Sequence, residues 1–366
     1  MSHSAPTAPT LREPSGTYIQ ELRYIREQVL PRYDERNIWQ KDDVFSFGKL
    51  LARSTRPLKV TTKRINYSNI LLYQSGKLVG GFDRTLTSLA SHQARRACTS
   101  RYSQRSYLRA SELPIPEGKI FPAEQAQNAL EYQQQLGAPT TVRPISGKTQ
   151  HGFSSGISTD DQLTDAWEVA AEACSTLPAT QRQILVEQHH SGLDLRMYVV
   201  GEEVVGVVVR LPFYVVGDGE SNLAELHERL VTALETDAYL KPPTLDDVQS
   251  LLARWDSSPN HTPGNGEVVP LSETAGAAPS RAITVDATHD VAPELKQLAI
   301  DAMWAFPGLS ASGVDLRVRG IDDPAEAMIT DVDPAADFKE FRYPTYGKYR
   351  RVSLNIIRHM VQQSNG

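Results

Sequence analysis

Four charged side chains near two β-branched runs are the residues of this chain best suited to chemistry on an anionic substrate. Glu187 follows a short apolar run, Asp194 lies seven residues later, and Arg196 follows two residues after that. Arg210 closes the second β-branched run. A guanidinium group holds a carboxylate or a phosphate through two parallel hydrogen bonds, so this order suits binding of either group. A buried hairpin with solvated charges at its ends fits the same order, and the sequence leaves both interpretations open.

Three aspartates near the C-terminus form a second group of candidate residues. Asp315 lies in the run 313–318, and Asp331 and Asp333 lie in the run 327–333. Strand alternation puts Asp331 and Asp333 on one face. If the two strands pair, three carboxylates would meet at one place, which suits Mg²⁺ held together with nucleotide phosphates. Solvated aspartates at strand ends are the alternative.

Strand and loop signals indicate what positions these residues. The runs 197–200 and 204–209, joined by residues 201–203, predict a β-hairpin. The run 140–144 predicts a strand that enters a loop at 146–156, which is rich in Gly and Ser. Small residues there would let backbone N–H groups approach phosphate oxygens, although a plain surface loop has a similar composition.

Composition and charge narrow the class of protein. The chain has 366 residues, a formal net charge of −6 and 40% hydrophobic residues, which is enough for two or three modest subdomains. The acidic balance disfavours a nucleic-acid partner. No apolar run approaches the ~18 residues of a membrane span, and the N-terminus lacks a signal-peptide pattern, so we expect no membrane partner. Cys98 and Cys174 form no metal or redox motif, which favours the cytoplasm.

The N-terminal part of the chain predicts a small α/β unit behind a tail. Residues 1–16 are rich in Ser, Pro and Thr, as is typical of disordered tails. Residues 18–33 have apolar side chains at helical spacing, and the runs 58–62, 69–73 and 78–82 predict strands. The sequence reveals no ligand for this unit.

The segment around Glu187 resembles the ATP-grasp carboxylate–amine ligases, and among them the ATP-grasp part of cyanophycin synthetases. The motifs are V-E-x-x-x-x-G-x-D-x-R at 186–196, R-x-P at 210–212 and V-V-G-D-G before a helix at 215–219. The resemblance covers roughly residues 95–360. It implies an α/β (α+β) fold of the ATP-grasp type, in which two α+β lobes clasp a nucleotide. The expected parts are a disordered tail (1–16), a pre-ATP-grasp α/β domain (17–98), a nucleotide lobe with a glycine-rich flap (99–190) and a C-terminal lobe with the metal site (191–366).

The resemblance also implies roles for the candidate residues. Nucleotide would be bound by Arg101 and Arg143 at the phosphates, Ser146, Gly147, His151 and Gly152 in the flap, Glu187 at the adenine hinge and Asp194 at the ribose hydroxyls. The catalytic residues would be Arg196 and Arg210, which would stabilise the carboxylate and the acyl phosphate, and Mg²⁺ would be held by Asp315, Asp331 and Asp333. Arginines stand where the family has lysines, and Asp331 and Asp333 replace Glu and Asn. Because the charge signs at the phosphate and metal sites are kept, an active, divergent enzyme is favoured.

The implied activity is that of an ATP-dependent, ADP-producing ligase with ATP and Mg²⁺ as cofactors. It would join a carboxylate to an amine through an acyl phosphate, with amino acids or short peptides as substrates, and a homodimer is common among relatives. Two alternatives remain: a non-catalytic or regulatory nucleotide-binding protein on the same fold, and a phosphoryl transferase that stops before amide formation. ATP hydrolysis that occurs only when an amine is supplied would separate the ligase from both.

Overall fold

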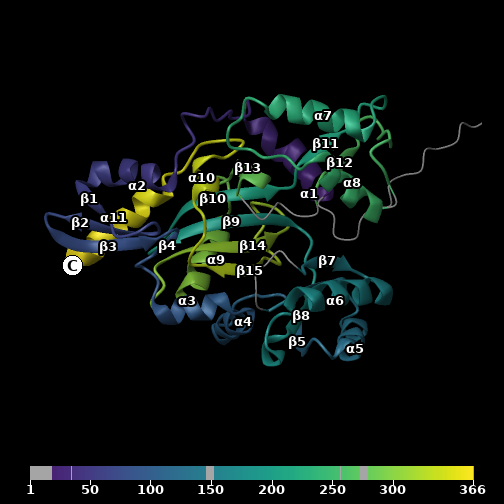
Figure 1. Ribbon diagram of the computed structural model, residues 1–366, viewed down its shortest axis with the longest axis horizontal. Coiled ribbons are helices and arrows are strands. Elements are labelled where there is room, and N and C mark those ends of the chain that lie inside the picture. Colours follow the sequence, from purple (N-terminus) through teal and green to yellow (C-terminus); the bar gives the residue numbers. More distant parts are fainter. Residues whose placement is uncertain (1–18, 34, 146–151, 256, 273–278, 366) are drawn as a thin grey trace, which may run out of the picture.

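The computed structural model describes residues 19–33, 35–145, 152–255, 257–272 and 279–365. The expected tail at 1–16 and the flap residues Ser146, Gly147 and His151 lie outside the described residues. The described strands form two four-stranded sheets, one five-stranded sheet and one two-stranded ladder. Figure 1 shows the five-stranded sheet in the middle of the molecule, with the smaller units around it. None of the described helices is long and apolar enough to cross a bilayer.

The five-stranded sheet is antiparallel and has the order β13-β10-β9-β14-β15. Its strands are β9 (Leu193–Val200), β10 (Glu203–Leu211), β13 (Ile283–Asp286), β14 (Ala311–Val318) and β15 (Met328–Asp333). The predicted hairpin is the β9–β10 pair, and the predicted pairing of the two aspartate-bearing strands is confirmed, with Asp315 opposite Asp331. Helix α9 (Pro293–Trp304) packs on one face and begins with a proline, which suits the first helical turn because its N–H would have no partner there.

The two faces of β9 have different surroundings. On one face, side chains pack in the main hydrophobic core with α9, and these are Leu195, Met197 and Val199. On the other face Asp194 and Arg196 come first, and Tyr198 follows inside a second hydrophobic cluster. Strand alternation therefore brings Asp194 and Arg196 to the same side of the sheet. Tyr198, the next residue on that side, belongs to the second hydrophobic cluster.

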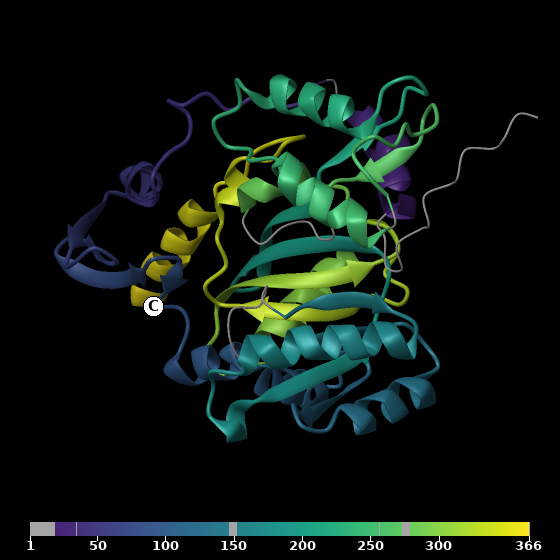
Figure 2. The same ribbon diagram turned by 45° about the vertical axis from the view of Figure 1, so that its right-hand side comes forward.

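A four-stranded sheet with two helices lies within residues 99–190, the range predicted for the nucleotide lobe (Figure 2). Its strands are β5 (Gly118–Pro122), β6 (Thr140–Pro144), β7 (Ser154–Ile157) and β8 (Gln183–Gln188), and its helices are α5 (Ala126–Leu136) and α6 (Asp160–Cys174). Apolar residues of α5 and α6 pack in one cluster with β6 and β8. A reciprocal capping box of Thr159 and Gln162 fixes the start of α6, because each side chain satisfies a backbone N–H that the helix leaves free.

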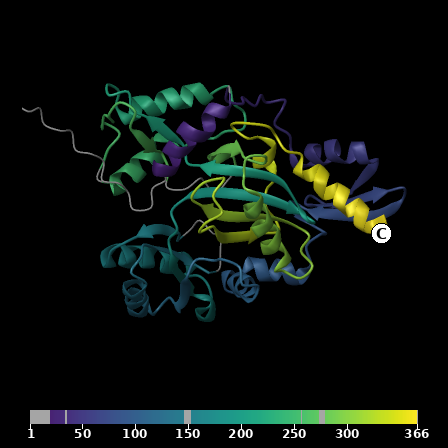
Figure 3. The ribbon, with the colours of Figure 1, turned by 180° about the vertical axis from the view of Figure 1, so that it is seen from behind.

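The N-terminal sheet is completed by a helix from the opposite end of the chain. The sheet consists of β1 (Val60–Arg64), β2 (Asn69–Gln74), β3 (Lys77–Asp83) and β4 (Leu86–Thr87), and α2 (Phe47–Thr55) packs beside it. The C-terminal helix α11 (Val352–Asn365) packs against α2 and β3, as Figure 3 shows from behind. Ile356, Ile357 and Met360 enter the same core, so the two ends of the chain stabilise each other.

The remaining elements connect or flank these sheets. They are α1 (Ile19–Tyr24), α3 (His92–Thr99), α4 (Arg101–Ala110), β11 (Tyr214–Val216), α7 (Leu223–Leu234), α8 (Leu245–Arg254), β12 (Val268–Pro270) and α10 (Lys339–Arg342). The helix predicted over 18–33 is shorter than expected, since α1 passes into a π turn at Ile25–Val29 and a 3₁₀ turn at Leu30–Arg32. Pro31, which has no backbone N–H to donate, lies in the 3₁₀ turn that ends this helical segment.

Candidate functional site

A cavity of about 180 Å³ lies between the four-stranded and five-stranded sheets, and we call it the cleft. Six of the candidate residues line it: Arg101, Arg143, Glu187, Asp194, Asp315 and Asp331. They come from α4, β6, β8, β9, β14 and β15, so both lobes contribute. Gly152, the one flap candidate within the described residues, has a φ of +82°, a left-handed conformation that favours glycine.

Helix α4 connects the two sides of the cleft. Ser100 caps its start by accepting a hydrogen bond from the backbone N–H of Ser103. Arg101 and Arg105 lie one turn apart on the same face, as the four-residue spacing requires. Arg101 donates two hydrogen bonds to Asp331 on the five-stranded sheet, at 3.0 and 3.2 Å. Arg105 donates to Glu187 on the four-stranded sheet, so one helical turn holds an acid from each lobe.

Glu187 on β8 is a buried acid that is paired with two arginines. Its side chain is only 6% exposed, and its two oxygens lie 2.5 Å from a nitrogen of Arg105 and of Arg143 respectively. Burial lowers the pKa of both arginines, while the Glu187 carboxylate opposes that effect. Each oxygen of the Glu187 carboxylate thus contacts a guanidinium group, so the side chain is held in place before any ligand arrives.

Arg196 and Arg210 form a second ion-pair network on the five-stranded sheet. Arg196 donates two hydrogen bonds of 2.6 Å to Asp315, and Arg210 donates two to Glu340, at 2.7 and 2.9 Å. Arg210 also reaches Asp315 at 3.4 Å, which joins the two pairs. Burial opposes ionisation of Asp315, but Arg196 and Arg210 outweigh it and lower its pKa to about 2. Asp315 therefore stays charged, and the two acids hold the two guanidinium groups through paired hydrogen bonds.

Two further candidate acids are paired more loosely. The Asp333 carboxylate lies 3.9 Å from Arg196, and the Asp194 carboxylate lies 4.0 Å from Arg317. Burial raises the pKa of Asp333 and of Asp194 above the ordinary value for aspartate, because the nearby arginines only partly offset it. These two carboxylates are thus easier to protonate than Asp315.

The three candidate metal ligands face arginines more closely than they face one another. Asp315 and Asp331 are direct register partners, and Asp333 is the partner of Gly313 on the same strand as Asp315. Yet Arg196 stands at the Asp315 carboxylate and Arg101 at the Asp331 carboxylate. Within the described residues, no three His, Cys, Asp or Glu side chains are grouped so as to hold a metal ion. In this arrangement the donor set fits ion pairs and does not fit Mg²⁺.

Unsatisfied polar atoms show that the cleft does fit a polar ligand. Arg143 Nε, His189 Nε2 and His190 Nε2 are buried and have no hydrogen-bond partner in the structure. Burial, followed by the charge of Arg317 and then by His190, lowers the pKa of His189 to about 4, so its ring is neutral near pH 7. Buried polar atoms without partners are unfavourable by about 1–3 kcal/mol each. A ligand with donors and acceptors of its own, such as a nucleotide, would satisfy them.

Sequence analysis missed two parts of this site. Glu340, whose side chain is 1% exposed, holds Arg210 but lies on the short helix α10, in a segment with no motif that could have indicated it. His189 and His190 lie two and three residues after the selected residue Glu187, and their position just past the end of β8 was the available signal. The assigned roles of the other candidate residues remain predictions.

Comparisons with known proteins find similar sequences and a similar solved structure. No family model matches it. It is 29% identical over 278 residues to a cyanophycin synthetase of Trichormus variabilis, which covers 71% of this chain and 29% of that protein. It is 25% identical over 253 residues to the glutathione biosynthesis bifunctional protein GshAB of Mannheimia succiniciproducens, which covers 66% of this chain and 32% of that protein. The chain therefore spans less than a third of the length of these relatives.

A solved structure shows the same fold. The bifunctional glutathione synthetase from Pasteurella multocida superposes with a TM-score of 0.61 and 19% sequence identity, over 86% of this chain and 43% of that one. This likeness covers both lobes and extends well beyond the motifs that suggested it.

Proposed function

We propose that this chain, which has the ATP-grasp fold and is related to cyanophycin synthetases and bifunctional glutathione biosynthesis proteins, is an ATP-dependent carboxylate–amine ligase. It would form an amide bond between a carboxylate and an amine and release ADP and phosphate. Amino acids or short peptides are the proposed substrates, and ATP and Mg²⁺ are the proposed cofactors. The chain's free, buried cysteines fit the cytoplasm as the proposed location.

One observation carries this proposal: charged residues from both lobes, selected by motif, line a single cleft. Phosphoryl transfer needs little covalent help from a protein, and catalysis is mainly positioning together with neutralisation of charge. The cleft offers arginines from α4 and β6 on one side and from the five-stranded sheet on the other. That distribution suits a reaction in which two anionic groups must be brought together.

The residues of the chain divide the task between them. The nucleotide would form hydrogen bonds with the nitrogen atoms of Arg143, His189 and His190 that lack partners in the structure. Bound ATP supplies the phosphoryl group that converts the substrate carboxylate into an acyl phosphate. Arg196 and Arg210, which Asp315 and Glu340 keep charged and oriented, would neutralise the carboxylate as it approaches. Binding of Mg²⁺ would require Arg101 to release Asp331 and turn toward phosphate oxygens, which are also oxyanion acceptors.

The test is ADP formation with sets of amino acids as carboxylates and hydroxylamine as the amine. An acyl phosphate that forms in the cleft reacts with hydroxylamine to give a hydroxamate and phosphate, and the hydroxamate is read by its iron complex. We expect hydroxamate only when ATP, Mg²⁺ and a suitable carboxylate are all present. ATP binding without ADP formation under any condition would favour the non-catalytic alternative. Transfer of the phosphoryl group to a stable product, without amide or hydroxamate, would favour the phosphoryl transferase.

A conservative variant connects this activity to the site. Arg210→Lys keeps the positive charge beside Glu340 but loses the planar fork, so we expect kcat to fall about 100-fold while the melting temperature changes little. Arg109→Lys makes the same change at an exposed position on α4 and should leave kcat unaltered. Equal activity in the two variants would exclude Arg210 from the reaction. Sedimentation of the wild-type chain tests the proposed homodimer.

A further inference from the structure

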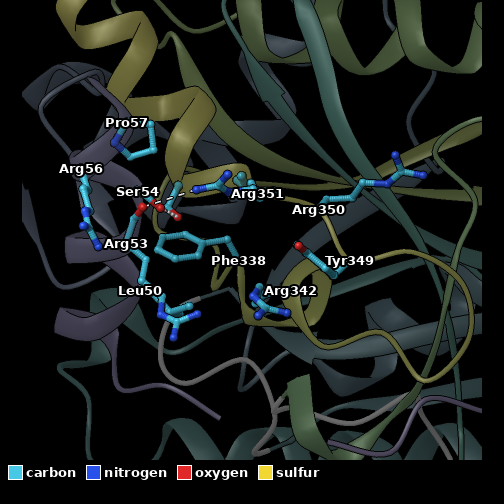
Figure 4. Close-up of a pocket in the computed structure, with 12 residues that line it drawn as sticks. Leu50, Arg53, Ser54, Arg56, Pro57, Phe338, Arg342, Tyr349, Arg350 and Arg351 are labelled. Carbon is cyan, nitrogen blue, oxygen red and sulfur yellow. Dashed lines mark hydrogen bonds between the residues drawn. The ribbon is translucent and has the colours of Figure 1, made fainter. Parts of the chain in front are cut away.

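A second cavity, of about 420 Å³, lies outside the cleft, and we call it the α2–α11 pocket (Figure 4). One wall comes from α2 and the turn Arg56–Leu58 that follows it, and the other comes from α10 and the segment that leads into α11. A hydrogen bond of 2.7 Å between Ser54 and Ser353 joins the two walls. The volume falls within the range of about 300–1,000 Å³ that is usual for small-molecule sites.

The lining of this pocket is strongly basic. Five of its twelve lining residues are arginines and none is Asp or Glu; the arginines are Arg53, Arg56, Arg342, Arg350 and Arg351. The chain as a whole has a net charge of −6, so the charge of the pocket lining is opposite in sign to that of the whole chain. A concave surface lined by one sign of charge concentrates ligands of the opposite sign.

Four of these arginines have no acidic partner in the described part of the chain. Arg350 is the exception, because it forms an ion pair with Asp286, and Figure 4 shows its guanidinium group turned away from the others. Arg351 donates only to the backbone oxygen of Arg53, at 3.4 Å. Nη1 of Arg342 is buried and has no hydrogen-bond partner among the residues that the structure describes. A buried guanidinium N–H without a partner is unfavourable, and an anion in the pocket would correct this.

Aromatic rings hold two of these guanidinium groups without neutralising them. The guanidinium of Arg53 lies 3.9 Å from the ring centroid of Phe45, and that of Arg342 lies 4.3 Å from the ring centroid of Tyr349. Cation–π contacts of this kind restrict the orientation of the cation and leave its hydrogen-bond donors available at the ring's edge. Arg53 and Arg342 are therefore positioned before a ligand binds, which reduces the entropy lost on binding.

We propose that the α2–α11 pocket is a binding site for a small anionic ligand that carries at least two carboxylate or phosphate groups. A ligand with one charge would neutralise only one of four unpaired cations, whereas a polyanion contacts both walls at once. Arg53 and Arg56 would hold it from the N-terminal side, and Arg342 and Arg351 from the C-terminal side. The site needs no turnover of ATP, so the proposal goes beyond the ligase activity and is tested separately from it.

The experiment is isothermal titration calorimetry of the full chain at low salt with pyrophosphate, citrate and tri-aspartate, and with acetate as the singly charged probe. We expect saturable binding of the polyanions but not of acetate. The double variant R53Q/R351Q should weaken that binding at least about tenfold, because two charge-assisted contacts are lost. The control R96Q/R358Q removes the same charge from exposed positions on α3 and α11 outside the pocket, and it should retain the wild-type affinity.

Both altered arginines of the pocket are exposed, so the double variant is expected to fold, and its melting curve checks this. A charge reversal, Arg53→Glu, should abolish binding and provides an independent variant. Stronger binding of tri-aspartate and citrate would identify the ligand as an acidic amino acid or peptide, and stronger binding of pyrophosphate would identify a phosphorylated one. The proposal is overturned if no polyanion binds saturably, or if R53Q/R351Q and the control bind equally well.

Discussion

Arginines line both the cleft and the α2–α11 pocket, but the groups that they face are different. In the cleft and in the ion-pair network directly beside it, Arg101, Arg196 and Arg210 each form hydrogen bonds with at least one carboxylate. In the pocket, Arg53, Arg56, Arg342 and Arg351 form no ion pair within the described residues. The same side chain therefore serves two purposes: in the cleft it fixes buried acids, and in the pocket its charge is available to a ligand.

Burial explains the difference. The side chains of Arg101, Arg196 and Arg210 are 10%, 12% and 14% exposed, and an isolated charge at such depth is strongly unfavourable. Arg53, Arg56 and Arg351 are exposed, so water stabilises their charge without a partner. The three buried arginines are therefore paired by the fold itself, whereas the exposed arginines can remain unpaired until an anion arrives.

Helix α10 connects the two regions. Glu340 points into the cleft network and holds Arg210, while Arg342, two residues later, lines the pocket. The short helix lies against β10 of the central sheet. One short helix therefore contributes a side chain to each region.

The largest expected effect comes from unpairing an acid in the cleft. Arg210→Met leaves Glu340, which is almost wholly buried, without its two closest hydrogen bonds. We expect the free energy of unfolding to fall by about 3–5 kcal/mol, as is typical when one partner of a buried ion pair is removed. Arg53→Met in the pocket should change it by no more than about 0.5 kcal/mol. Urea denaturation of both variants measures the difference.

A double variant separates loss of the ion pair from loss of packing. Arg210→Met with Glu340→Leu removes both charges, so it should recover most of the stability that Arg210→Met loses. A similar loss in the free energy of unfolding for Arg210→Met and Arg53→Met would mean that the buried ion pair contributes no more to stability than the exposed, unpaired arginine.

Local patterns in the sequence predicted the strands of the cleft but not the partners of its charges. Alternation along β15 put Asp331 with Asp333, and the predicted pairing of β14 with β15 is confirmed. The pairing of Arg101 with Asp331 joins residues that are 230 positions apart. A period of two or of 3.6 residues determines which face a side chain occupies, but not what lies opposite that face.

The α2–α11 pocket could not be predicted from the sequence for a related reason. Its walls come from the N-terminal unit and from the last helix, and nothing local in either segment indicates that they meet. Ile356, Ile357 and Met360 could be recognised as one apolar helix face, yet the sequence does not identify the sheet that this face covers. Arginines such as Arg53 and Arg351 consequently have the pattern of ordinary solvated residues until the fold brings them together.

The second expected effect is a pH dependence of the free energy of unfolding that arises from His189 in the cleft and has no counterpart in the pocket. Burial lowers the pKa of His189 from its usual 6.5 to about 4, so between these values the unfolded chain binds a proton that the folded chain does not. The free energy of unfolding should therefore fall as the pH drops from 6.5 to 4, with a slope of up to about 1.4 kcal/mol per pH unit.

Comparison of variants isolates this contribution from that of the carboxylates. His189→Gln cannot take up the proton, so its stability should fall less than that of the wild type between pH 6.5 and 4, and the two should run parallel above pH 7. Arg53→Gln in the pocket titrates nothing in this range and should follow the wild-type slope. Urea denaturation at half-unit pH steps checks both, and a His189→Gln curve with the full wild-type slope would refute the assignment.

The smallest expected effect concerns repulsion between the unpaired arginines. Arg351 lies close enough to the Arg53 backbone for a 3.4 Å hydrogen bond, and both side chains lie at one pocket without a counter-charge. Arg351→Gln removes one of these like charges and should raise the free energy of unfolding by about 0.2–0.5 kcal/mol at low salt. At 1 M salt, where the screening length is about 3 Å, the gain should vanish.

The exposed ion pair of Arg319 with Glu326 provides the control of opposite sign. Arg319→Gln loses a weak attraction, so it should lower stability slightly or leave it unchanged at low salt. If the pocket arginines were neutralised within the folded chain, as those of the cleft are, Arg351→Gln would lower stability as well. An increase in the free energy of unfolding of Arg351→Gln that disappears at high salt would therefore show that the pocket arginines repel one another. A decrease would show that they are paired with acids within the folded chain.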